Sequence, residues 1–173
     1  MAHRKIGGAA LAVGMLFAAW LLSVMPAAPL LAEQQEARYE EQYRAETDPV
    51  RQAKILAKLG PIEVNAAGAE SKSDQDEQAL SRLQHLRDEV QRTAQALADT
   101  GVDASRHASG FKELQIGLRQ TVRRLDDLIF ALPLDSRPPF EAVRSDLAAS
   151  ENSLIAALFP PSPKKKGKKE QAN

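Results

Sequence analysis

The feature that most constrains the fold is a seven-residue repeat of apolar side chains between residues 111 and 132. Further apolar residues fill adjacent positions and widen the repeat into a broad stripe. A stripe of this width indicates a helix facing the core of a bundle rather than a narrow two-stranded coiled coil. The repeat positions are Phe111, Leu118, Leu125 and Leu132, with Leu114, Val122, Leu128 and Ile129 beside them.

Two other stretches carry apolar residues at spacings of three and four. Residues 80–97 form one stripe, and Gly101 follows it as a residue suited to the left-handed end of a helix. Residues 140–158 form the other, which Pro133 separates from the preceding helix and Pro160 ends. The pattern therefore predicts three long helices of about 20–26 residues, each about 30–39 Å long.

The chain before residue 73 carries weaker helix signals. Residues 33–47 are rich in strong helix formers and predict a short, exposed helix. Asp48 followed by Pro49 predicts the start of a second small helix, which we expect Gly60-Pro61 to end. Residues 61–72 are interpreted as a linker, after which Ser73 would cap the first long helix.

These elements predict an all-α fold. The expected architecture is an up-and-down antiparallel helical bundle of three long helices plus one or two shorter N-terminal helices. Loops of about ten and six residues join the long helices, and short loops favour antiparallel neighbours. No stretch alternates with the period of two that a strand requires. We place the bundle domain at residues 33–159.

Residues 1–32 have the order of a secretory signal peptide. Arg4 and Lys5 precede an uncharged run from Ile6 to Ala32, which ends in small residues, so we expect cleavage after Ala32. The alternative is an uncleaved anchor in the inner membrane, because residues 6–24 are nearly long enough to cross about 30 Å of hydrocarbon. Either interpretation predicts an extracytoplasmic location, periplasmic or secreted, for the remaining chain.

Charge and cysteine content exclude several classes of function. Residues 33–163 hold 22 acidic and 16 basic side chains, a net charge of −6, which disfavours nucleic acid as a partner of the body. The chain has no cysteine, so disulfides, thiolate-bound zinc and cysteine nucleophiles are excluded.

Few residues suggest chemistry. His85 and Glu89 stand four apart, but two ligands rarely hold a metal, so no metal or cofactor is expected. Ser109 before Gly110 faintly resembles a nucleophile, although capping of the next helix explains it better. Asp126 and Asp127 are adjacent on one helix and point about 100° apart, which predicts surface charges rather than an acid–base pair. We therefore predict no catalytic residue and no enzymatic activity.

A basic patch lies on the helix of residues 111–132. Arg119, Arg123 and Arg124 could bind phosphate or carboxylate, but Asp126 and Asp127 stand close enough along the helix to neutralise them. The favoured interpretation is a solvated face of ion pairs.

Residues 160–173 form a proline- and lysine-rich tail, expected to be extended and disordered. Its basic residues could make weak contacts with anionic lipid or a wall polymer, or could simply keep the protein soluble. The possible binding residues are Lys164, Lys165, Lys166, Lys168 and Lys169.

Three functional hypotheses remain. The first is a non-enzymatic interaction or scaffold protein of the cell envelope, which binds another envelope protein or itself. The second is a module that binds anionic surfaces through the lysine tail. The third is an enzyme of an unrecognised helical type, which a deep pocket gathering Tyr39, Tyr43, His85 or Arg124 would support.

Overall fold

The computed structural model describes residues 28–161, with side chains from residue 33 onward. The predictions about residues 1–27 and about the lysine tail lie outside the described residues. The described part is helical with no strand, so the all-α prediction is confirmed. Its elements are α1 (Ala28–Ala45), α2 (Pro49–Lys72), α3 (Asp76–Asp99), α4 (Phe111–Ala131), the 3-10 turn η1 (Leu134–Ser136) and α5 (Arg137–Leu158).

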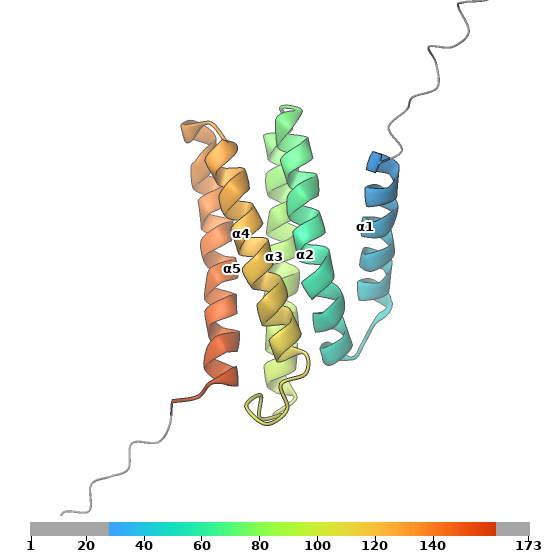
Figure 1. Ribbon diagram of the computed structural model, residues 1–173, viewed down its shortest axis with the longest axis vertical. Coiled ribbons are helices and arrows are strands. Elements are labelled where there is room, and N and C mark those ends of the chain that lie inside the picture. Colours follow the sequence, from blue (N-terminus) through green and yellow to red (C-terminus); the bar gives the residue numbers. More distant parts are fainter. Residues whose placement is uncertain (1–27, 162–173) are drawn as a thin grey trace, which may run out of the picture.

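Helices α2 to α5 form two antiparallel hairpins that pack side by side (Figure 1). Helix α2 pairs with α3, and α4 pairs with α5. Across the two hairpins, α2 packs against α4 and α3 packs against α5, and the helices of each such pair run in the same direction. Helix α1 lies outside this bundle, against α2.

The arrangement corrects the expectation that the helices on either side of the loop at residues 100–110 are neighbours, whereas α4 and α5 are neighbours as expected. Helices α3 and α4 are consecutive in the chain but are not among the main packing pairs. The connection between them, residues 100–110, crosses the end of the bundle. At about 3.3 Å per residue, a segment of this length easily reaches a diagonal position. A fourth long helix, α2, lies between α3 and α4.

The predicted break at Gly60-Pro61 is wrong, because α2 continues through both residues to Lys72. The linker expected at residues 61–72 is therefore helical, and α2 is a long helix rather than a small one. Proline removes one backbone hydrogen bond inside a helix, which α2 tolerates because both residues are buried by tertiary packing.

Glycines allow α2 and α4 to approach closely. A Cβ atom placed on Gly117 of α4 would lie 2.5 Å from the Cα atom and 2.6 Å from the carbonyl oxygen of Ala57 in α2. That carbonyl is the one whose helical donor Pro61 lacks. A Cβ atom on Gly60 would lie 2.6 Å from the hydroxyl oxygen of Thr121. Gly60 therefore serves a close helix crossing and not a helix end.

The helix ends follow the sequence signals in part. Asp48 caps α2, with its Oδ1 accepting from the Val50 N–H at 2.8 Å, and Gly101 has a φ of 67°, both as expected. Ser73 ends α2 instead of starting α3, which Gln75 precedes. Ser109 does not cap α4. The Glu113 carboxylate instead accepts from the Gly110 N–H at 2.7 Å.

The predicted apolar stripes form the core. Repeat residues Phe111, Leu118, Leu125 and Leu132 are all buried, and they pack in one cluster with the stripes of α2, α3 and α5. Among residues 28–161, no helix is both long and apolar enough to cross a membrane.

Candidate functional site

The described side chains of α1, from residue 33 onward, contact the bundle largely through polar groups. Of residues 33–45, only Tyr43 is buried, and Tyr39 is half-buried with the Lys58 ammonium 6.0 Å from its ring centre. The Tyr43 hydroxyl lies 2.8 Å from the Thr93 hydroxyl and donates to the Glu89 carbonyl at 3.4 Å. Burial raises the pKa of Tyr43. A tyrosine that buries its ring and bonds its hydroxyl fixes the position of α1 against α3.

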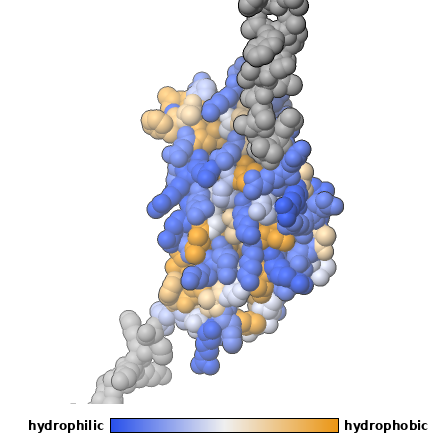
Figure 2. Space-filling model, turned by 45° about the vertical axis from the view of Figure 1, so that its right-hand side comes forward, coloured by the Kyte–Doolittle hydropathy of each residue, from blue (hydrophilic) through white to orange (hydrophobic). Residues whose placement is uncertain are grey.

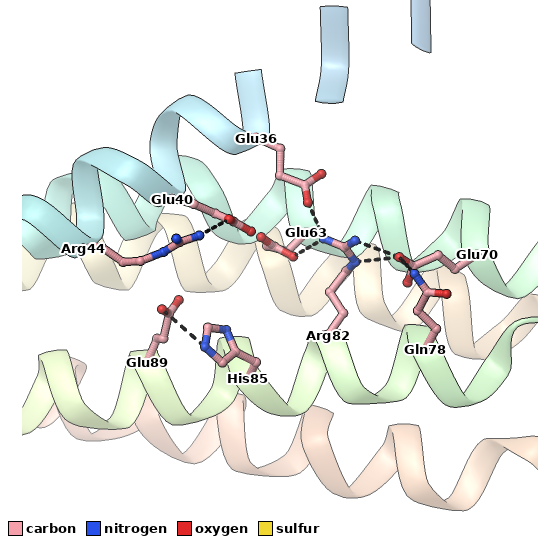
Figure 3. A network of polar contacts seen from close by, with 9 residues as sticks. All are labelled: Glu36, Glu40, Arg44, Glu63, Glu70, Gln78, Arg82, His85 and Glu89. Atoms are coloured by element: carbon pink, nitrogen blue, oxygen red, sulfur yellow. Dashed lines mark hydrogen bonds and ion pairs between the residues drawn. The ribbon is translucent and has the colours of Figure 1, made fainter. Parts of the chain in front are cut away.

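Arg82 of α3 is the centre of a network that joins three helices (Figure 3). Its guanidinium donates to Glu63 Oε2 at 2.8 Å and to Glu70 Oε1 at 2.7 Å, both on α2. It also donates to the Glu36 carboxylate on α1. The planar guanidinium offers five donors in a fixed geometry, so one side chain can bind three carboxylates.

The network holds more negative than positive charge. Carboxylate oxygens of Glu36, Glu40 and Glu63 lie within 4.8 Å of one another, and Glu70 adds a fourth acid. Burial raises the pKa of Glu63 to about 7 although Arg82 opposes the shift, and the nearby Glu36 and Glu40 charges raise it further. Glu63 therefore holds a proton over part of the neutral pH range.

The pKa of Arg82 is raised as well, which for a base favours the charged form. Burial disfavours its charge, but the hydrogen bonds to Glu70 and Glu63 outweigh burial and raise its pKa. Gln78 also donates to Glu70 Oε1, at 3.3 Å, while the buried Oε2 atom of Glu70 accepts no hydrogen bond from the described residues. Arg82 therefore stays charged at the centre of the cluster, and carboxyl groups outnumber it.

Two clefts lie beside the contact between α1 and the bundle. A cleft of about 630 Å³ lies between α1, α2 and α3, and Arg82, Glu36, Glu70 and Gln78 line it. A second cleft, of about 480 Å³, includes Tyr43, His85, Glu89 and Thr93. Both are shaped by the gap between α1 and the bundle.

The arrangement recognises a helix better than it binds a cation. Glu36, Glu40 and Glu63 have the spacing to coordinate a metal ion, but Arg82 already donates to two of these three carboxylates. A guanidinium in that position occupies two of the carboxylates and repels a second cation. The chemistry at hand is therefore charge-assisted hydrogen bonding between helices.

The residues singled out from sequence are dispersed. His85 Nε2 lies 3.8 Å from Glu89 Oε1, as their spacing predicts, and burial raises the pKa of Glu89. The second cleft gathers Tyr43 and His85 but neither Tyr39 nor Arg124.

The basic patch of α4 forms polar contacts across helices rather than along α4. Arg119 bonds Glu151 at 3.2 Å and Arg124 bonds Asn65 at 2.8 Å. Asp126 was expected to neutralise the patch but instead bonds Arg144 of α5 at 2.8 Å. The neighbouring α5 and α2 supply the partners because they pack on both sides of α4.

The central residues of the site, Glu36, Glu63, Glu70 and Arg82, were not predicted from the sequence. A signal was present, because Glu63 follows Leu56 and Leu59 at the spacing of a buried helical face. That signal is visible only if the helix is continued through Pro61. A glutamate on a buried face requires a basic or hydrogen-bonding partner, and Arg82 is that partner in the structure.

The described residues define an all-helical protein with a polar contact between its outer helix and a four-helix core. Comparison with protein-family models, curated proteins and solved structures finds no match. Function is therefore inferred from this geometry.

Proposed function

We propose that this chain is an exported, non-enzymatic interaction protein of the cell envelope. In this proposal the long helices act as an up-and-down bundle that presents one face for binding a helix. We call it the α1-binding face and define it as the surface of α2 and α3 that carries Glu63, Arg82, Glu89 and Thr93. The partner is a helix of another envelope protein or of a second copy.

The observation that supports this proposal is the single arginine that binds carboxylates from α1 and α2 together. Residues 33–45 of α1 contribute little apolar burial, so specific polar contacts decide where α1 lies. Interfaces of this polar kind resemble those between exchangeable partners more than those inside a core. Arginine and tyrosine are also the residues that most often dominate binding energies at interfaces.

A variant pair tests whether Arg82 recognises the helix. Arg82→Gln should speed amide hydrogen exchange in α1 by about a factor of ten or more, which corresponds to losing roughly 1.5 kcal/mol of charge-assisted contact. Exchange in α4 and α5 should not change. Arg92→Gln is the matched control, because Arg92 is exposed on the same helix and bonds only the Asp88 carbonyl among the described residues. Equal effects of the two variants would refute the assignment.

Binding itself is tested in the host envelope. A photo-crosslinking residue at Gln78, in the cleft beside Arg82, should give one discrete adduct of defined mass. The same residue at the exposed Ser145 of α5 should give none. The adduct should disappear in Arg82→Gln and persist in Arg92→Gln. Identical adducts from both positions, or none from Gln78, would contradict the proposal.

A second candidate function rests on the lysine tail. Five lysines lie within residues 164–169, against a body of net charge −6. This separation of charge supports a role in attaching the protein to anionic lipid or wall polymer.

A further inference from the structure

The junction of α4 and α5 exposes large apolar side chains at one end of the bundle. We call residues 130–137 the α4–α5 tip. Phe130 is 81% exposed and Leu134 is 75% exposed, and only Asp135 and Arg137 are charged within the tip. Figure 2 shows a hydrophobic patch at this end, next to a largely hydrophilic face. Covering such side chains with an apolar surface removes them from water and lowers the free energy.

Part of the backbone of the tip is satisfied by hydrogen bonds within the chain. Arg137 donates from Nε to the Leu132 carbonyl at 3.0 Å and from Nη2 to the Phe130 carbonyl at 2.9 Å, and its guanidinium lies 6.0 Å from the Phe130 ring centre. The Leu132 N–H donates to the carbonyls of Leu128 and Ile129, and the Ser136 N–H donates to the carbonyl of Pro133. Each carbonyl that is paired in this way lowers the cost of moving the turn out of water.

The position of the tip relates it to the start of the described chain. Figure 1 shows that α1 begins at the same end of the bundle as the α4–α5 tip. The uncharged run that starts at Ile6 leads into α1 and ends at Ala32, within the first turns of this helix. If that run is retained as the uncleaved anchor in a bilayer, the tip faces the same bilayer.

The size of the patch argues against a protein partner. A stable protein interface buries about 800 Å² on each side. Two exposed side chains offer roughly half of that at most, since an aromatic residue contributes about 150–250 Å². The polar turn between α2 and α3 lies at the same end and interrupts any larger apolar surface (Figure 1). A lipid surface needs no shape complementarity, so a small apolar tip suffices.

We propose that the α4–α5 tip docks into the interfacial layer of a lipid bilayer, with Phe130 and Leu134 inserted below the headgroups. The polar α2–α3 turn then lies among the headgroups. This surface is separate from the α1-binding face, so a test of one proposal does not decide the other.

Tryptophan reporters test the docking in the full chain. The natural Trp20 is first replaced by phenylalanine, and Phe130→Trp is compared with Phe159→Trp. Phe159 is 74% exposed at the opposite end of the bundle and is therefore a matched control. In vesicles of phosphatidylcholine with brominated acyl chains, the Phe130→Trp variant should show blue-shifted emission and several-fold stronger quenching than the Phe159→Trp variant. Neutral lipid is chosen because it offers the lysine tail no net opposite charge.

The outcomes separate the possible occupants. Equal quenching in both variants, or no association with vesicles, overturns the proposal. A blue shift in the Phe130→Trp variant that grows with protein concentration without lipid would show docking of a second copy and would also overturn it. As an independent measurement, Phe130→Asp with Leu134→Asp should lower partitioning into the vesicles several-fold, whereas Phe159→Asp should not. Circular dichroism confirms that each variant keeps its helices.

Discussion

Glu63 is the residue whose environment departs most from that of an ordinary surface acid. Its folded pKa of about 7 exceeds the ordinary value of 4.5 that applies when the chain unfolds. The folded protein therefore binds a proton more tightly than the unfolded chain does between these values. Its favourable contribution to stability is complete below about pH 4.5 and is lost as the pH rises through about 7. Burial raises the pKa of Glu89 as well, so Glu89 acts in the same direction.

We predict that Glu63→Gln weakens the pH dependence of unfolding. The wild type should lose stability between about pH 5 and pH 8, by an amount on the order of 2 kcal/mol from Glu63. The glutamine variant should lose less over that range and should be more stable than the wild type at about pH 8. Urea denaturation at several pH values measures the effect. Glu77→Gln, at an exposed position in the first turn of α3, should leave the dependence unchanged.

At this scale the sequence predicts apolar burial well and polar contacts poorly. The leucines of the repeat are buried because their spacing alone places them on one helical face. The Arg82 network joins residues up to 46 positions apart. Such partners become neighbours only through tertiary packing, so the sequence around Arg82 gives no indication of them. The contact between His85 and Glu89 follows from their spacing of four residues, because it is local to one helix.

At the scale of elements, α2 shows how tertiary contacts override local helix-breaking signals. Gly60-Pro61 has the composition of a helix end, yet the helix continues because α3 and α4 cover it on two sides. The small residues instead permit the close crossing with α4, where Gly117 meets the Ala57 backbone. The ends of α3, α4 and α5 were more predictable, because Gly101, Pro133 and Pro160 end a helix through their own backbone properties and need no tertiary contact.

Two glycine substitutions distinguish packing from helix propensity. Gly117→Ala places a methyl group against the α2 backbone and should destabilise the protein by about 2–3 kcal/mol. Gly68→Ala in α2 meets only Leu128 Cδ1, at 3.7 Å, and should stabilise it by up to about 1 kcal/mol because alanine favours helix. Thermal unfolding followed by circular dichroism measures both. Destabilisation of similar size by the two variants would contradict the close α2–α4 packing.

At the scale of the whole molecule, the all-α class and the α4–α5 hairpin were predictable, but the other helix pairs were not. Periodicity reports which face of each helix is buried and says nothing about which helix covers it. Missing the full length of α2 left α3 and α4 as apparent neighbours, whereas α2 and α5 lie between them. A diagonal connection such as residues 100–110 has no sequence signature beyond its length.

The lysine tail gives a prediction that concerns the intact chain. Replacing Lys164, Lys165, Lys166, Lys168 and Lys169 with glutamine should reduce binding to phosphatidylglycerol vesicles at least about tenfold, since each lysine contributes up to about 1 kcal/mol. Replacing the same five with arginine keeps the charge and should preserve binding. Co-sedimentation at low and high salt measures both. Aspartates at Phe130 and Leu134 in every variant remove the contribution of the α4–α5 tip.

The chain enters the bundle at one end and leaves it at the other, because α1 starts where α4 meets α5 and α5 runs back along the full length (Figure 1). With 22 residues at about 1.5 Å each, α5 sets this separation at about 33 Å. If the α4–α5 tip and the lysine tail are both attached as proposed, α5 holds the two attachment points at this fixed distance. A different distance would require all four bundle helices to lengthen together, whereas either proposed attachment could change through a few surface residues.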